Sequence, residues 1–269
     1  MMHYLRTWSS AFLLVLLLLI GGTIASPTAT AAPPPDAVYD ALGDSYASGY
    51  GVPPYGPCGR SSSAYAVQLD GRQKIALDDF VACAGATTVS LVSGGQLTAL
   101  DADTDLVTLT IGGNDIGWSQ AVTACLGGTD AQCAGATALV SARITNQLPV
   151  LLDTVYAQVS AAAPNAHVVV TGYPRLFSPK FGAFLGASPD EQDALNAGAN
   201  LLNTMIKAAA DRAGFQFVDV ASRFDGHGVN APAAWILGPF DPAPFHPNIN
   251  GYKAYTAAIN SALGPVKLG

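Results

Sequence analysis

The sequence predicts an α/β protein whose helices flank a central parallel sheet. Short runs of apolar, β-branched residues, most of them ended by a glycine turn, have the pattern of buried strands in such a sheet. Longer amphipathic stretches lie between these runs, and this alternation of strand and helix is typical of a parallel α/β domain. The expected strands cover residues 38–43, 106–112, 167–172 and 215–220.

Three stretches carry helical patterns. Apolar residues recur at helical spacing over 139–159, and Pro149 is expected to break or kink this helix. A second helix begins at Ser188, where Ser-Pro-Asp-Glu supplies an N-cap, a proline at the first helical position and a capping glutamate; it ends at Gly214. A last helix is expected over 251–263. Segments rich in Gly, Pro and Ser are expected to form loops near the strand ends, where parallel sheets bind ligands, over 46–65, 112–135 and 222–248.

The first 31 residues have the pattern of a secretory signal peptide. Arg6 precedes an apolar run over 11–20, and an Ala-Thr-Ala site at 29–31 precedes three prolines. The alternative is an uncleaved membrane anchor, but the strongly apolar stretch is shorter than the roughly 20 residues that a spanning helix needs. We therefore expect one domain over 32–269. The mature chain is expected to be extracellular or associated with the cell envelope, without stable membrane insertion.

Composition excludes several classes of protein. Half of the 269 residues are hydrophobic and 12% are charged, with a mean hydropathy of +0.31, which excludes a disordered chain. Twelve basic residues are scattered among 19 acidic ones, for a net charge of −7. No basic stripe for phosphate is visible, so nucleic acid is not an expected partner.

The four cysteines point to disulfides. Cys58, Cys83, Cys125 and Cys133 include no C-x-x-C pair and have no histidine at zinc spacing, so no metal site is expected. An exported protein can keep disulfides. Four cysteines allow three connectivities, of which sequential pairing closes the shortest loops, and composition does not choose among them.

Three short motifs carry candidate chemistry. Ser45, in Gly-Asp-Ser-Tyr after the first expected strand, is a candidate nucleophile. Asn114, in Gly-Gly-Asn-Asp after another strand, offers an amide to a developing oxyanion. His246, ahead of the last helix, is a candidate base. Each alone has a plainer explanation as a turn, a helix cap or a surface histidine.

Taken in order, these motifs resemble the blocks of the SGNH (GDSL) hydrolases. Gly43-Asp-Ser45, Gly85, Gly112-Gly-Asn-Asp115 and His246 match the four blocks. The resemblance spans essentially the whole mature chain and favours the secreted actinobacterial esterase and lipase branch. It implies a flavodoxin-like three-layer α/β/α sandwich. The matching flanks are 41–49, 83–88, 172–174 and 245–248.

The resemblance also implies roles for individual residues. Ser45 would attack the ester carbonyl and His246 would accept its proton. The oxyanion would be held by the backbone N–H groups of Ser45 and Gly85 and by the side chain of Asn114. A neutral serine hydroxyl needs such a base, and the tetrahedral oxyanion needs preorganised donors.

One position departs from the family pattern. Many members carry aspartate three residues before the histidine, where this chain has Ala243. Some secreted relatives resemble a dyad in which the backbone carbonyl at that position orients the imidazole, and Ala243 would supply such a carbonyl. Asp241 is the alternative, although it lies two residues too early.

The same branch bears on the cysteines and on a second histidine. Its spacings support the pairs Cys58–Cys83 and Cys125–Cys133. It often has a third disulfide near a Gly-His-x-x-Cys stretch, and here Asn230 stands where that cysteine would be. His227 in this stretch is therefore expected to be a loop residue that shapes the pocket rather than the base.

Aromatic residues near the loops either line an acyl pocket or belong to the core, and the sequence does not separate the two roles. The residues concerned are Trp118, Phe181, Phe184, Trp235 and Phe240.

The sequence thus predicts a secreted, monomeric serine hydrolase that cleaves lipid-like or other acyl esters through an acyl-serine intermediate, without a metal or cofactor. A carbohydrate O-deacetylase is the alternative within enzymes. A secreted binding module that kept the fold and lost activity is the alternative outside them, with Ala243 as the feature in its favour.

Overall fold

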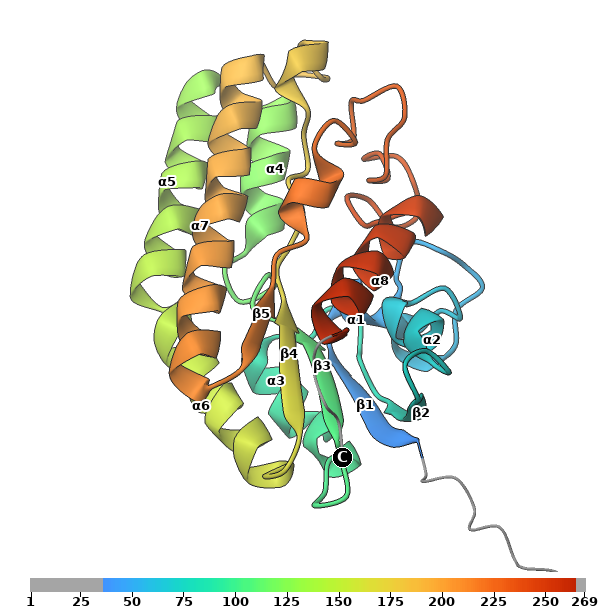
Figure 1. Ribbon diagram of the computed structural model, residues 1–269. Coiled ribbons are helices and arrows are strands. Elements are labelled where there is room, and N and C mark those ends of the chain that lie inside the picture. The colour runs from blue at the N-terminus through green and yellow to red at the C-terminus, as the bar shows by residue number, and fades with distance from the viewer. Residues whose placement is uncertain (1–35, 265–269) are drawn as a thin grey trace, which may run out of the picture. The chain divides into compact units, whose positions relative to one another are not determined.

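The computed structural model describes residues 36–264, which contain a five-stranded parallel sheet with the strand order β2-β1-β3-β4-β5 (Figure 1). The predicted parallel sheet is confirmed. Its strands are β1 (Ala37–Gly43), β2 (Ile75–Phe80), β3 (Leu106–Thr110), β4 (His167–Thr171) and β5 (Gln216–Val218).

Strand β2 was not among the four predicted strands. It lies at the edge of the sheet, and most of its side chains are exposed or only partly buried. The sequence Ile-Ala-Leu-Asp-Asp-Phe therefore lacks the continuous apolar run by which the central strands were predicted. Strand β3 is the opposite case, because all five of its residues are buried.

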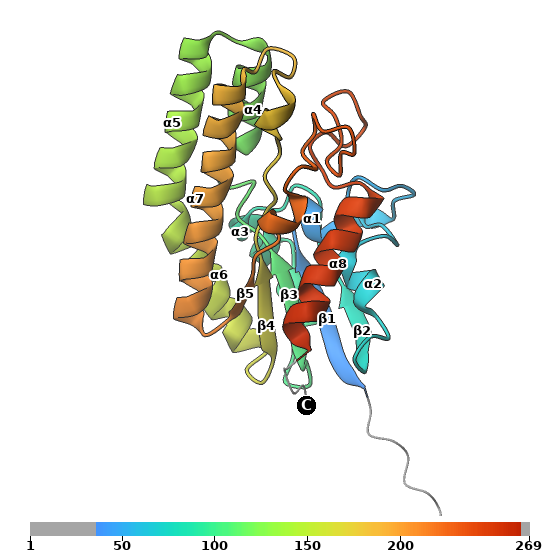
Figure 2. The same cartoon turned by 45° about the horizontal axis from the view of Figure 1, so that its top comes forward.

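Helices cover both faces of the sheet, as predicted. Helices α2 (Tyr65–Leu69) and α8 (Ile249–Leu263) pack against each other, α2 also contacting β2 and α8 contacting β5. Helices α3 (Thr88–Ser93), α6 (Leu148–Ala162) and α7 (Pro189–Ala213) form the opposite layer (Figure 1, Figure 2). Helix α5 (Asp130–Asn146) packs on α4 (Trp118–Gly127), α6 and α7.

The predicted helix boundaries are close to the observed ones. The helical stretch over 139–159 is divided into α5 and α6 at Gln147, so that Pro149 lies in the first turn of α6, where its missing N–H removes no helical hydrogen bond. Ser188 caps α7 in a capping box, and Gly214 ends it in the left-handed conformation. Helix α8 starts two residues before the prediction because Asn248 caps it.

Both predicted disulfides are present. Cys58–Cys83 links the loop after α1 (Ser45–Ser48) to the loop after β2. Cys125–Cys133 joins the end of α4 to the start of α5. The first bond holds the loop that carries Gly85, and the Ala84 N–H also donates to the Cys58 carbonyl at 2.8 Å.

The predicted signal peptide over residues 1–31 lies outside the described residues. Within 36–264, no helix combines the length and the apolar character that a membrane crossing requires.

Candidate active site

The predicted nucleophile and base meet beyond the carboxyl ends of the strands. Ser45 follows β1, and His246 lies in the loop between β5 and α8. Figure 2 shows this loop and helix α4 beyond the same end of the sheet. Ser45 Oγ and His246 Nε2 are 2.8 Å apart, although 201 positions separate them in the chain.

A sharp turn places Ser45 at this edge. Asp44 caps α1 by accepting the Tyr46 N–H at 2.9 Å, so Ser45 is the first residue of the helix. Its N–H is among the groups at a helix start that have no carbonyl partner within the helix. The preceding Gly43 has φ +130°, and a Cβ there would lie 2.4 Å from the Thr110 carbonyl oxygen. Only glycine fits this turn.

A backbone carbonyl fixes the tautomer of His246. Nδ1 lies 2.9 Å from the carbonyl oxygen of Pro244. A carbonyl can only accept, so Nδ1 carries the proton and Nε2 is left with a lone pair toward the Ser45 hydroxyl.

The carbonyl at hydrogen-bond distance from Nδ1 is that of Pro244, one residue after the predicted Ala243, whose carbonyl also acts on the ring. The Ala243 carbonyl accepts the backbone N–H of His246 at 3.3 Å, while Asp241 accepts the Gly238 N–H at 2.6 Å. The physical reason is the turn at Phe245, whose φ of +61° folds the chain so that the Pro244 carbonyl reaches the ring. A carbonyl dyad was expected, but its main acceptor is one residue later.

Tyrosines hold the histidine loop against the serine turn. The Tyr46 hydroxyl donates to the Phe245 carbonyl at 2.6 Å. The rings of Tyr46 and Tyr50 lie 5.2 and 5.1 Å from the imidazole, centroid to centroid. Burial lowers the pKa of His246 below its ordinary value of 6.5, and hydrogen bonds with the Pro244 and Ala243 carbonyls oppose the shift. The lowered pKa favours the neutral imidazole, which is the form that can accept a proton.

The predicted oxyanion donors come from two loops that are tied together. Asn114 Nδ2 donates to the Ala86 carbonyl at 2.9 Å, and Asp115 accepts both the N–H and the hydroxyl of Thr88. Asn114 lines the cavity beside Ser45. Gly85 is exposed, has φ +84° and stands next to Ala86, but it is not part of the cavity wall. The oxyanion roles of Ser45, Gly85 and Asn114 remain a prediction.

A buried link between the serine turn and the asparagine loop was missed by the sequence analysis. The Tyr173 hydroxyl donates to Asp44 and accepts the Gly113 N–H at 3.0 Å. Burial raises the pKa of Asp44 from 3.8 to about 7, although the hydrogen bonds from Tyr173 and the Tyr46 N–H oppose the shift. The Gly-Tyr-Pro motif at 172–174 was the available signal, but nothing in the sequence pairs its tyrosine with Asp44.

A mostly apolar cavity of about 540 Å³ opens from Ser45 and His246. Trp118, Val122 and Leu126 lie on one face of α4, so this wall is about 12 Å long at the helical rise per residue. Residues of the loop over 239–246 also line the cavity. Leu185 and Phe240 line the cavity and are nevertheless 55% and 88% exposed, so they mark its mouth.

Of the five aromatic residues that were candidates for the pocket, two line the cavity and three do not. Trp118 and Phe240 line the cavity. Phe184 packs beside Phe177, and the exposed Phe181 lies in the loop before α7, outside the cavity wall. Trp235 packs against Phe224 and is likewise outside the wall.

His227 was predicted to be a loop residue that shapes the pocket, but it is not part of the cavity lining. Its ring stacks on Trp235 with centroids 3.7 Å apart, and its Nδ1 donates to the Ala233 carbonyl at 2.7 Å. Both contacts lie within its own loop, so the histidine orders that loop instead of facing Ser45.

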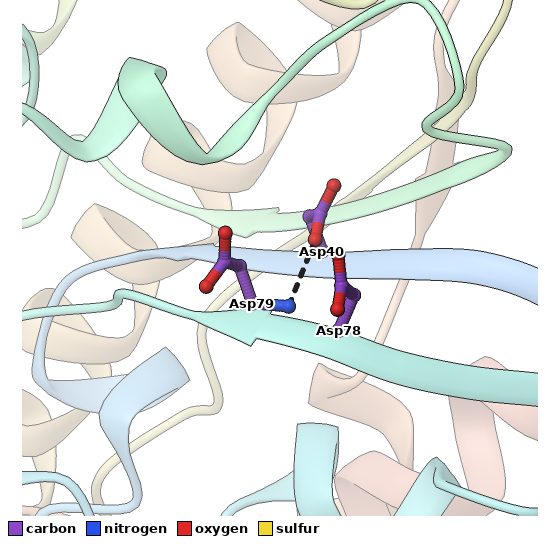
Figure 3. A group of neighbouring side chains, drawn as sticks. All are labelled: Asp40, Asp78 and Asp79. Atoms are coloured by element: carbon purple, nitrogen blue, oxygen red, sulfur yellow. Dashed lines mark hydrogen bonds between the residues drawn. The ribbon is translucent and has the colours of Figure 1, made fainter.

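An acidic cluster, Asp40, Asp78 and Asp79, is the group in the described residues whose spacing resembles a metal site (Figure 3). Asp40 is buried, and its carboxylate accepts the Asp79 N–H at 2.9 Å and the Thr104 hydroxyl at 2.7 Å. The pairing of β1 with β2 shifts register at this point. Asp40 thus satisfies a backbone group that the irregular ladder frees.

The family of GDSL-like lipases and acylhydrolases has a model that matches residues 41–254. The chain belongs to this family. It is 39% identical to Lipase 1 of Streptomyces coelicolor over 228 residues, which cover 83% of this chain and 84% of that protein. It is 38% identical to a lipase of Streptomyces rimosus over 232 residues, 83% and 86% of the two chains. This GDSL acylhydrolase is an ester hydrolase.

Solved structures agree with this assignment. The crystal structure of phospholipase A1 from Streptomyces albidoflavus NA297 superposes with a TM-score of 0.79 at 37% identity, covering 84% of this chain and 99% of that one. An acetyl-xylooligosaccharide esterase of Geobacillus superposes with a TM-score of 0.54 at 17% identity, over 86% and 95% of the chains, and shows the shared fold alone.

Proposed function

We propose that this hydrolase is exported and cleaves esters of medium or long acyl chains through an acyl-serine intermediate. The observation that carries the proposal is the pair Ser45 Oγ and His246 Nε2, 2.8 Å apart at the inner end of an apolar cavity. The apolar lining favours an acyl chain over the short acetyl group of a carbohydrate O-deacetylase substrate.

In the acylation step, Ser45 Oγ attacks the ester carbonyl carbon while Nε2 of His246 takes the hydroxyl proton. The electron pair of the carbonyl moves onto its oxygen, which faces the N–H groups of Ser45 and Gly85 and the Asn114 amide. As the tetrahedral intermediate collapses, the bond to the alcohol oxygen breaks and the imidazolium protonates that oxygen. The acyl group is then bound to Ser45.

Deacylation reverses these roles. His246 takes a proton from water, the hydroxide attacks the acyl carbon, and the bond to Ser45 Oγ breaks with return of the proton to the serine. The Pro244 carbonyl holds Nδ1–H throughout, so Nε2 stays directed at Ser45.

The test is hydrolysis of p-nitrophenyl esters from acetate to palmitate by the oxidised protein. We expect Ser45→Ala and His246→Ala each to lower kcat by about 10⁴-fold or more, because nucleophile and base act as a unit. The exposed Ser222→Ala and the stacked His227→Ala are matched controls that should keep activity. Mass spectrometry should find the trapped acyl group on the peptide that contains Ser45. Full turnover by a folded Ser45→Ala protein would exclude the mechanism.

Export is supported by the leader pattern and by the two disulfides. N-terminal sequencing of protein collected from the medium of an expressing actinobacterial host should give a chain that begins at Ala32. Retention of the whole product inside the cells would contradict this part of the proposal.

A further inference from the structure

A glycine in α7 lies directly behind the cavity wall. Gly198 is buried and is not itself part of the cavity lining. An alanine Cβ at this position would lie 2.8 Å from Cζ3 and 3.1 Å from Cη2 of the Trp118 indole, which does line the cavity. Both distances are shorter than ordinary van der Waals contact.

Glycine is needed at position 198 because of limited space and not because of backbone conformation. The residue lies well inside the 25-residue helix α7, and its φ is outside the range that strains other residues. Alanine would be the better helix former at such a position. What alanine lacks is room, because the far end of the indole ring occupies the place of its methyl group.

We propose that Gly198 is a positioning residue for acyl-chain selectivity, because it lets the Trp118 ring sit back against α7 and thereby keeps the cavity open for chains longer than acetyl. The inference rests on the proposed function, since it names the part of that site that sets substrate length.

The direction of the effect follows from what surrounds the ring. Ala199 and Leu202 of α7 line the cavity beside Trp118, so the open volume next to the indole is the cavity itself. To reach ordinary contact at 3.4 Å, the ring would have to move about 0.6 Å away from a methyl group at 198. That movement is into the cavity, where the acyl chain would lie.

The experiment compares kcat/KM for p-nitrophenyl acetate, butyrate, octanoate and palmitate in Gly198→Ala and the wild type. Octanoate and palmitate should lose about 4-fold for each methylene that is displaced from the wall, chiefly through a higher KM. Acetate should change least, because its acyl group is the shortest of the series. The matched control is Gly135→Ala, also a glycine inside a helix, whose added Cβ meets nothing within 4 Å.

A second variant keeps the test decisive if Gly198→Ala folds poorly. Trp118→Leu removes the ring and should shift selectivity toward longer chains. In that background, Gly198→Ala should have no further effect on the octanoate-to-acetate ratio, because two residues that act through one contact are not additive. An octanoate-to-acetate ratio that is unchanged in both single variants would overturn the inference.

The outcomes separate this inference from the proposed function. If the wild type hydrolyses esters through Ser45 but neither Gly198→Ala nor Trp118→Leu changes the octanoate-to-acetate ratio, only the role of Gly198 is wrong. If no ester is hydrolysed through Ser45, the proposed function is wrong, and so is the role of Gly198 in selectivity.

Discussion

Backbone carbonyls orient the imidazole of His246, where a carboxylate does so in many serine hydrolases. The Pro244 carbonyl accepts from Nδ1 but carries no full charge, so the imidazolium of the proposed mechanism would gain no ion pair. The turn at Phe245 that creates this contact could not be predicted from the sequence, because it depends on the path of the loop. The identities of Ser45 and His246 could be predicted, since their motifs are local.

The pH dependence should reflect this arrangement. Burial lowers the pKa of His246 below 6.5, and the histidine can serve as the proposed base only when it is neutral. As the pH falls, kcat/KM for the acetate ester should therefore drop with a midpoint below 6.5. A midpoint above 6.5 would contradict the carbonyl dyad and point to a nearby carboxylate.

Asp241→Asn should change kcat less than about tenfold. The Asp241 carboxylate accepts the Gly238 N–H, and an asparagine oxygen can accept the same bond. The ratio of kcat values for the wild type and the variant measures this directly. A fall of several orders of magnitude would transfer the orienting role to Asp241.

At the level of elements, polar side chains join loops that lie far apart in the sequence. Asn230 Oδ1 accepts the Ser178 N–H at 2.8 Å, and Nδ2 donates to the Ser178 carbonyl at 3.0 Å. It thereby links the loop before α8 to the loop before α7, at the position where a third disulfide was noted as missing. The sequence showed the absent cysteine but not its replacement, because hydrogen-bond partners distant in the chain leave no local pattern.

Asn230→Ala should lower the free energy of unfolding by about 2 kcal/mol, because it leaves the buried Ser178 N–H without a partner and removes one of the two hydrogen bonds to the Ser178 carbonyl, which still accepts from the Phe181 N–H. Urea denaturation measures the loss. Asn146→Ala, at an exposed position at the end of α5, is the matched control and should stay within about 0.5 kcal/mol. Equal stability of the two variants would show that the link contributes nothing.

At the level of the whole molecule, the parallel sheet and its two helical layers could be predicted because buried strands and amphipathic helices repeat along the chain. The edge strand β2 could not, since half-exposed edge residues lack that signal. Two disulfides then tie neighbouring segments together: Cys58–Cys83 joins two loops, and Cys125–Cys133 joins α4 to α5. Cys58–Cys83 spans 25 positions and Cys125–Cys133 spans 8.

Removing each disulfide as a pair of Cys→Ser changes should destabilise the protein in the order of loop length. Loop-closure entropy gives about 3.5 kcal/mol for Cys58–Cys83 and about 2.5 kcal/mol for Cys125–Cys133. Chemical denaturation of the two double variants, each compared with the oxidised wild type, checks the order. A larger loss from the shorter loop would show that native-state contacts outweigh chain entropy here.

The hydrogen bond between the Pro244 carbonyl and His246 Nδ1 also affects what mutagenesis of this enzyme can reveal. Pro244→Ala deletes a ring but keeps the main-chain oxygen that His246 uses. On the proposed mechanism, an alanine scan would therefore detect Ser45, His246 and Asn114 through their side chains, but it would not detect the Pro244 carbonyl. The proposed site thus contains a main-chain acceptor that side-chain substitution cannot remove.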